Sequence, residues 1–215
     1  MKPIVIFASL FCIFLIGAAL FLGTHDSGGS RLINMDPQYT QRTVDGYWKR
    51  GSDTPKVTLD VYSDFQCEAC VVEYPIIEAA MQTAGPSVQL RFHEFPLNTS
   101  PTSILAAEAA ESAGRQGKFW LMYQRLYSTH TAWMNQSQDQ LLATFLGYAK
   151  EFGMNPDQFK RDFNDSSLTD QIDVDVKNGN NLHVQSIPTF FINGKLSPLP
   201  QSSTELMSQL NSMTY

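Results

Sequence analysis

The sequence is poor in cysteine, in charge and in basic residues, and each shortage excludes a class of protein. Three cysteines among 215 residues are too few for a scaffold held together mainly by disulfides. Lysine and arginine number 15 against 21 acidic residues, and the net charge is −6. Nucleic-acid binding is excluded on this ground, because phosphate contacts need many basic side chains. Charged residues make up only 17%, whereas 43% are hydrophobic, which suffices for a packed core and excludes disorder throughout.

The N-terminus carries a long apolar run. Residues 4–23 contain no charge and follow Lys2. Such a run matches the roughly 20 residues that span a bilayer and exceeds the about 7–15 apolar residues of a cleavable signal peptide. We therefore expect residues 1–23 to be an uncleaved signal-anchor, with a cleaved signal peptide or a buried soluble helix as alternatives. Because Lys2 favours a cytoplasmic N-terminus, the remaining chain is expected outside the cytoplasm. It would be anchored facing the periplasm or cell exterior, or exported after cleavage.

The rest of the chain is predicted to be a linker followed by one α/β domain. Residues 24–44 are predicted as a stalk and 45–215 as the domain, with no strand before Lys56. Alternating β-branched and aromatic residues predict strands, and apolar faces at helical spacing predict helices. Strands are expected at 56–63, 87–95 and 189–192, and helices at 67–81, 103–116, 119–127, 138–152, 156–164, 167–182 and 203–212. This order, with a hairpin turn at Asn193-Gly194, predicts a β-α-β half and a β-β-α half separated by a helical insertion at about 100–183.

Two of the three cysteines form a C-x-x-C pair. Cys12 lies in the apolar run, where a cysteine acts as a small hydrophobe. Cys67 and Cys70 remain, in a compartment where disulfides persist. Half a zinc site is disfavoured, because no second pair exists and the histidines lack ligand spacing. A static structural disulfide stays open as an interpretation, although closing so short a loop stabilises a protein little.

Two motifs carry a resemblance to a known family. Residues 63–70 read Ser-Asp-Phe-Gln-Cys-Glu-Ala-Cys after an expected strand, and residues 187–195 read Ile-Pro-Thr-Phe-Phe-Ile-Asn-Gly-Lys, with Phe95-Pro96-Leu97 between them. In this order, and separated by a helical block, they resemble the thioredoxin superfamily, most of all its extracytoplasmic disulfide oxidoreductases of the DsbA type. The resemblance covers roughly residues 45–213 and implies a thioredoxin fold with a helical insertion.

The resemblance also implies roles for individual residues. Cys67 would be the exposed nucleophile that forms a mixed disulfide with a client protein, and Cys70 would resolve it. At the first turn of a helix, unpaired N–H groups and the helix dipole favour the thiolate of Cys67, which is the reactive form. The Ile187–Pro188 bond would be cis and would face the cysteine pair, so that the backbone of Ile187 binds an extended client. No cofactor and no metal ion is expected.

Two positions depart from the pattern of this family. The residue six before the first cysteine is usually a buried acid that assists proton transfer, and here it is Val61. The neighbouring Asp60 points to the opposite face of the strand by alternation. Glu68 and Ala69 stand between the cysteines as modulating residues. The charge of Glu68 is expected to disfavour the Cys67 thiolate, so Glu68→Gln should lower the pKa of Cys67 and make the protein a stronger oxidant.

Together these features predict a thiol–disulfide oxidoreductase that oxidises extracytoplasmic client proteins and is reoxidised by a membrane redox partner. A reductase or isomerase of the same fold is the alternative within the enzyme class. Outside it, the alternative is a non-catalytic binding or chaperone-like domain with a structural disulfide. His93 is expected to be structural. The large aromatic residues of the insertion are expected in its core; they are Trp120, Tyr123, Tyr127 and Trp133.

Overall fold

The computed structural model describes residues 41–43, 45–97 and 100–213. The predicted signal-anchor at 1–23 and the stalk up to residue 40 lie outside these residues. Within the described part of the chain, no helix combines the length and the apolar character that crossing a membrane requires.

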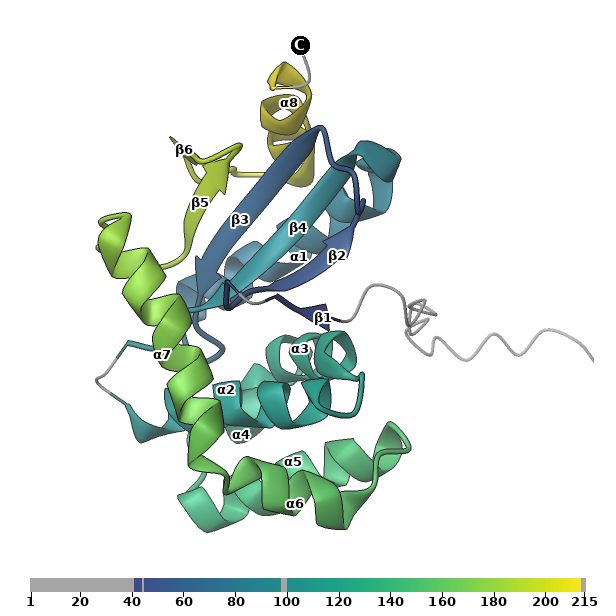
Figure 1. The fold of residues 1–215 in the computed structure, drawn as a ribbon, viewed down its shortest axis with the longest axis vertical. Coiled ribbons are helices and arrows are strands. Elements are labelled where there is room, and N and C mark those ends of the chain that lie inside the picture. The colour runs from purple at the N-terminus through teal and green to yellow at the C-terminus, as the bar shows by residue number, and fades with distance from the viewer. Residues whose placement is uncertain (1–40, 44, 98–99, 214–215) are drawn as a thin grey trace, which may run out of the picture. The chain divides into compact units, whose positions relative to one another are not determined.

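Six strands form one mixed sheet in the order β1-β2-β4-β3-β5-β6 (Figure 1). They are β1 (Gln41–Arg42), β2 (Trp48–Gly51), β3 (Val57–Ser63), β4 (Val88–Glu94), β5 (Thr189–Ile192) and β6 (Lys195–Ser197). The central strands β3 and β4 are parallel, and all other neighbouring pairs are antiparallel. The thioredoxin-like sheet predicted from the sequence is therefore confirmed, with two strands added at its N-terminal edge.

The added strands correct the prediction that no strand precedes Lys56. Strand β2 pairs antiparallel with β4, and Trp48 and Arg50 point inward from it. The alternation was hard to recognise because one of the two buried residues is charged. Arg50 is only 8% exposed and is paired with the carboxylate of Glu78, which removes the cost of burying an isolated charge.

The helices follow the predicted order closely. They are α1 (Glu68–Thr83), the 3₁₀ turn η2 (Gly85–Ser87), α2 (Pro101–Gly114), α3 (Phe119–Ser128), α4 (His130–Trp133), α5 (Gln138–Glu151), α6 (Pro156–Phe163), α7 (Ser166–Asn181) and α8 (Ser203–Ser212). Helix α1 runs through Pro75 without ending. Helices α2 to α7 form the insertion between β4 and β5, as predicted.

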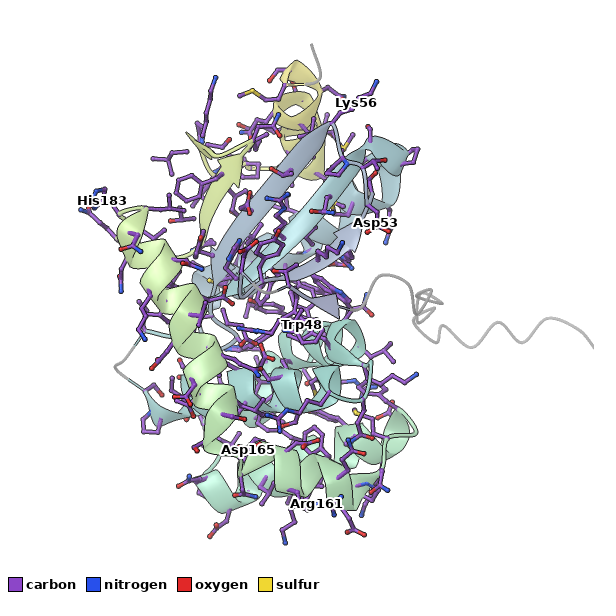
Figure 2. All side chains as sticks on the ribbon, viewed as in Figure 1. Trp48, Asp53, Lys56, Arg161, Asp165 and His183 are labelled. Atoms are coloured by element: carbon purple, nitrogen blue, oxygen red, sulfur yellow. The ribbon has the colours of Figure 1, made fainter. Side chains whose placement is uncertain are left out.

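One face of the sheet packs against α1, α3 and α8, with α1 lying directly after β3 in the chain (Figure 1). Leu59 and Val61 of β3 point to this face and are completely shielded from solvent. The aromatic residues of the insertion extend the same core and are buried, as expected: Trp120, Tyr123, Tyr127 and Trp133. Figure 2 shows Trp48 where β2 meets the insertion; its ring stacks on Phe119 at a centroid distance of 4.2 Å.

The opposite face of the sheet packs against α7. There the ring of Tyr62 stacks on that of His93 at 4.2 Å. The two ring nitrogens of His93 lie 3.2 Å from Asp175 Oδ1 on α7 and 3.1 Å from Asp60 Oδ1 on β3. His93 is thus structural, as predicted, and Asp60 points away from the cysteine face, as strand alternation predicted. Burial alone would lower the pKa of His93, but the hydrogen bonds and charges of the two carboxylates raise it.

The hairpin between β5 and β6 turns through Asn193 and Gly194, as predicted. Ile192 pairs directly with Lys195, so the loop contains only these two residues. Both have positive φ, at 50° and 74°. This is the conformation that asparagine and glycine favour in two-residue hairpin loops.

Helix α7 contains a glycine, Gly179, and the structure explains its presence. A Cβ at this position would lie 2.5 Å from a ring atom of Phe95 and 3.0 Å from a ring atom of Tyr62. The residue allows α7 to approach the sheet closely.

We expect Gly179→Ala to lower the free energy of unfolding by about 1–2 kcal/mol, because overpacking outweighs the gain in helix propensity. Gly147→Ala is the matched control. Gly147 is also helical, but no atom lies within 4 Å of its added Cβ, so the variant should gain up to about 1 kcal/mol. Urea denaturation of both variants measures the difference. If the free energy of unfolding rose equally in both, the close packing of α7 against the sheet at Gly179 would be refuted.

Candidate active site

Cys67 lies at the start of α1, where β3 has just ended. It is the N-cap residue, and its N–H donates to the carbonyl oxygen of Asp64 at 3.2 Å. Cys67 is half-buried, whereas Cys70, one turn further, is only 2% exposed. Both cysteines are free thiols in the structure. The expected geometry of one accessible and one buried sulfur at a helix start is therefore present.

The pKa of Cys67 lies at about 6, well below its ordinary value. The largest cause is a hydrogen bond from the side chain of Cys70, which outweighs the opposing effect of burial. Backbone N–H groups of Cys70 and Ala69 at the helix start contribute in the same direction. Cys67 is therefore mainly a thiolate at neutral pH, the form that attacks disulfides.

The pKa of Cys70 is shifted in the opposite direction to that of Cys67. Burial raises the pKa of Cys70 far above its ordinary value, and the hydrogen bond with Cys67 raises it further. Hydrogen bonds from the side chain of Ser63 and the backbone of Asp64 act in the opposite direction. The pair thus holds its proton on Cys70 and its negative charge on Cys67.

The second predicted motif lies beside the first. Ile187 and Pro188 are joined by a cis peptide bond, as predicted. The sulfur of Cys67 lies 3.9 Å from the carbonyl oxygen of Ile187, although the two residues are 120 positions apart. Pro188 is buried and Ile187 is half-buried. The fold therefore brings together Cys67, Cys70 and the Ile187–Pro188 bond.

The two departures from the family pattern take different forms. Val61 is completely buried in the apolar core, so no acid stands at that position. Glu68 is exposed in the first turn of α1. The carboxylate whose charge raises the pKa of Cys67 in the structure is Asp64, and the effect predicted for Glu68 stays a prediction.

Asp64 is a site residue that sequence reasoning missed. Its carboxylate is buried and accepts hydrogen bonds from the backbone N–H groups of Gln66 at 2.8 Å and Leu97 at 3.1 Å, and from the Ser103 hydroxyl at 2.7 Å. It thereby ties the segment before Cys67 to the chain after β4 and to α2. In the sequence, the one sign of a role for Asp64 is its position inside the first motif, residues 63–70.

The origin of the low Cys67 pKa can be tested by removing the Cys70 thiol. We expect Cys70→Ala to raise the pKa of Cys67 above about 6, because the largest stabilising hydrogen bond is lost. The pH dependence of alkylation by iodoacetamide measures it. Glu68→Gln keeps that hydrogen bond and should lower the pKa, as its charge predicts. An unchanged alkylation profile in Cys70→Ala would assign the low pKa to the helix start alone.

Comparison with known proteins agrees with this geometry. The family model described as Thioredoxin matches residues 43–212. A Na(+)/H(+) antiporter NhaA 1 of Salinispora arenicola is 32% identical over 148 residues, which are 68% of this chain but 21% of the antiporter. The chain thus spans about a fifth of the length of that curated relative. The "Probable disulfide bond formation protein D" of Bacillus cereus is 28% identical over 153 residues, covering 68% of this chain and 70% of the relative.

The fold has a close counterpart among solved structures. Oxidised BdbD from Bacillus subtilis superimposes with a TM-score of 0.67 at 19% identity, covering 82% of this chain and 97% of BdbD. At 19% identity this similarity shows the fold alone. The family is assigned from the family model, which matches residues 43–212. The chain belongs to the thioredoxin family, and its fold is that of the DsbA-type members.

Proposed function

We propose that this protein is a thiol–disulfide oxidoreductase that exchanges disulfides with client proteins. The observation that carries the proposal is the accessible Cys67, whose pKa of about 6 is set by the buried Cys70 one helical turn away. A fixed structural disulfide needs neither an accessible sulfur nor a stabilised thiolate. The family membership supports the same conclusion.

The roles follow from the positions of the residues. Cys67 attacks or is attacked by the client sulfur, and Cys70 closes or opens the intramolecular disulfide. The backbone of Ile187 beside Pro188 binds the client chain as an added extended segment, because its carbonyl lies next to the reactive sulfur. Glu68 and Ala69 modulate the reactivity of Cys67, Ala69 through its backbone N–H.

The proposed direction is oxidation of the client. A stabilised Cys67 thiolate favours the dithiol form of the protein, so its disulfide passes readily to a client. Such activity needs an oxidising compartment, and we propose that the domain faces the periplasm or cell exterior, attached through residues 1–23 and reoxidised by a membrane partner.

The test is the reduction potential of the Cys67–Cys70 couple, measured by equilibration with glutathione, together with the rate of its reduction by dithiothreitol. A potential near or above about −180 mV supports an oxidant or isomerase, and one near about −270 mV identifies a reductase. Slow reduction by dithiothreitol would contradict the proposed catalysis and identify a structural disulfide, the alternative outside the enzyme class.

A further inference from the structure

The buried sulfur of Cys70 lies close to the hydroxyl group of Ser63. A hydrogen bond from the side chain of Ser63, the last residue of β3, lowers the pKa of Cys70 against the larger effect of burial. The Ser63 oxygen in turn lies 2.7 Å from the hydroxyl oxygen of Tyr127 on α3. Ser63 is 4% exposed and Tyr127 is 3% exposed. The sulfur and the two hydroxyls therefore form a chain of buried polar groups.

Aromatic rings surround the Tyr127 end of this chain. The ring of Tyr127 is stacked on Tyr74 at 5.1 Å and lies 5.0 Å from Phe65. Val61, two residues before Ser63, presents only methyl groups to the same core. A negative charge on Cys70 would therefore depend strongly on the few donors that reach it.

A serine hydroxyl can serve both neighbours at once. It has one hydrogen to donate and two lone pairs that accept. With Tyr127 donating to Ser63, the Ser63 hydrogen is free to point at Cys70. The phenol of Tyr127 thus orients the serine hydrogen toward sulfur and polarises it.

We propose that the Ser63 hydroxyl, held in place by Tyr127, stabilises the Cys70 thiolate that forms during disulfide exchange. Ser63 would be a catalytic residue, because it contacts a reacting atom, and Tyr127 a positioning residue that acts through it. The pair supplies the polar contact where Val61 provides no acid. This inference rests on the proposed function and deepens it.

The chemistry requires a thiolate on Cys70 in both directions. When a client thiolate attacks Cys67 of the oxidised protein, a client–Cys67 bond forms, the Cys67–Cys70 bond breaks, and the electron pair stays on Cys70. In reverse, the Cys70 thiol gives its proton to water, its sulfur attacks Cys67, and the client sulfur leaves with the electron pair. Each direction passes through negative charge at the Cys70 sulfur, which the serine hydrogen stabilises.

This role has a kinetic signature. The Ser63 hydrogen bond is stronger to the charged sulfur than to the neutral thiol or the disulfide. Removing it should therefore slow exchange in both directions by the same factor and leave the reduction potential unchanged. A hydrogen bond to a charged group accounts for a rate factor of about ten to a hundred.

The experiment compares Ser63→Ala and Tyr127→Phe with the unmodified full-length chain. Stopped-flow measurements give the rate of reduction of the oxidised protein by dithiothreitol and the rate of reoxidation by oxidised glutathione. We expect Ser63→Ala to lower both rates by about ten- to a hundredfold, and Tyr127→Phe to lower both by a smaller factor. The reduction potential and the pKa of Cys67 should stay unchanged.

Two matched controls lose hydroxyls elsewhere. Ser112→Ala removes a buried serine hydroxyl on α2 that donates to the Glu108 carbonyl at 2.7 Å. Tyr148→Phe removes a tyrosine hydroxyl bonded to Thr129 at 2.9 Å. Both should keep the rates of the unmodified protein. Thermal melts of all four variants identify any loss of folded protein, and rates are compared per folded molecule.

The outcomes separate this inference from the proposed function. If the unmodified protein exchanges disulfides rapidly but Ser63→Ala does so at the same rate, the serine role is refuted and the proposed function stands. The serine role would also be refuted if Ser63→Ala lowered only one of the two rates and changed the reduction potential. The serine would then stabilise the disulfide or the dithiol form rather than the thiolate that forms during exchange. If the unmodified protein itself reacts slowly, the proposed function fails.

Discussion

Cys67→Ser is expected to abolish disulfide exchange, whereas Cys70→Ser is expected to accumulate mixed disulfides with client proteins. The first variant loses the accessible thiolate, and removal of a nucleophile lowers turnover by more than about a thousandfold. The second keeps that nucleophile beside Ile187 but has no buried thiol to release the bound client. Non-reducing electrophoresis of the full chain after incubation with a reduced, unfolded client in the presence of oxidised glutathione measures both.

Both variants are best made in a Cys12→Ser background, so that only the Cys67–Cys70 pair can react. The Glu68→Gln variant in the same background is the positive control, because it keeps both thiols. Trapping by Cys67→Ser and none by Cys70→Ser would reverse the assignment of nucleophile and resolving cysteine. Equal trapping by both would contradict the difference in burial between the two sulfurs.

The largest expected effect on stability comes from the opposite face of the sheet. His93→Leu should lower the free energy of unfolding by about 3–5 kcal/mol near neutral pH, because it removes the hydrogen-bond partner that the carboxylates of Asp175 and Asp60 share. Each carboxylate keeps only a more distant cation, Arg42 at 3.6 Å from Asp175 and Arg91 at 3.9 Å from Asp60. Asp175 is fully buried and Asp60 is largely shielded, so neither is compensated by water. His183→Asn is the control: His183 is exposed and has a φ of 58°, which asparagine tolerates.

The same site predicts the direction of the pH dependence. Because the folded pKa of His93 is raised above 6.5, its stabilising contribution is complete below that value and is lost as pH rises through the folded pKa. The deficit of His93→Leu should therefore shrink as pH rises through the folded pKa of His93. Denaturant titrations across this range measure it, and a deficit independent of pH would assign the effect to packing.

The elements of the fold were predictable where one local pattern dominated. Strands β3 and β4 alternate in sequence, β5 is a short apolar run before the turn residues Asn193-Gly194, and the insertion helices repeat apolar faces. These local patterns located the elements within a few residues. Strand β2 escaped because its buried face contains Arg50, whose partner Glu78 lies on α1. No local pattern reveals an ion pair between residues that only the fold brings together.

The residues of the candidate site also fall into those that local sequence motifs predict and those that they do not. Cys67, Cys70 and the Ile187–Pro188 bond were predictable because two short motifs mark them. Ser63 and Asp64 lie within the first motif, but their roles depend on Tyr127, Leu97 and Ser103, which come from other elements. Likewise, the charge on Glu68 was visible in the sequence, whereas that of Asp64 acquired its influence on Cys67 only through burial.

The position of the insertion has a consequence for the order in which a newly made chain folds. Strand β5 pairs with β3, and the register joins Leu59 to Ile192, so this contact must wait until the intervening helices have been synthesised. Pairings between such distant segments form slowly, since a long loop must close first. An unfinished chain therefore has its cysteines long before Pro188 exists to stand beside them. We expect the reactive pair to acquire its client-binding surface only as the last strands join, which keeps a growing chain from capturing partners before its own fold is complete.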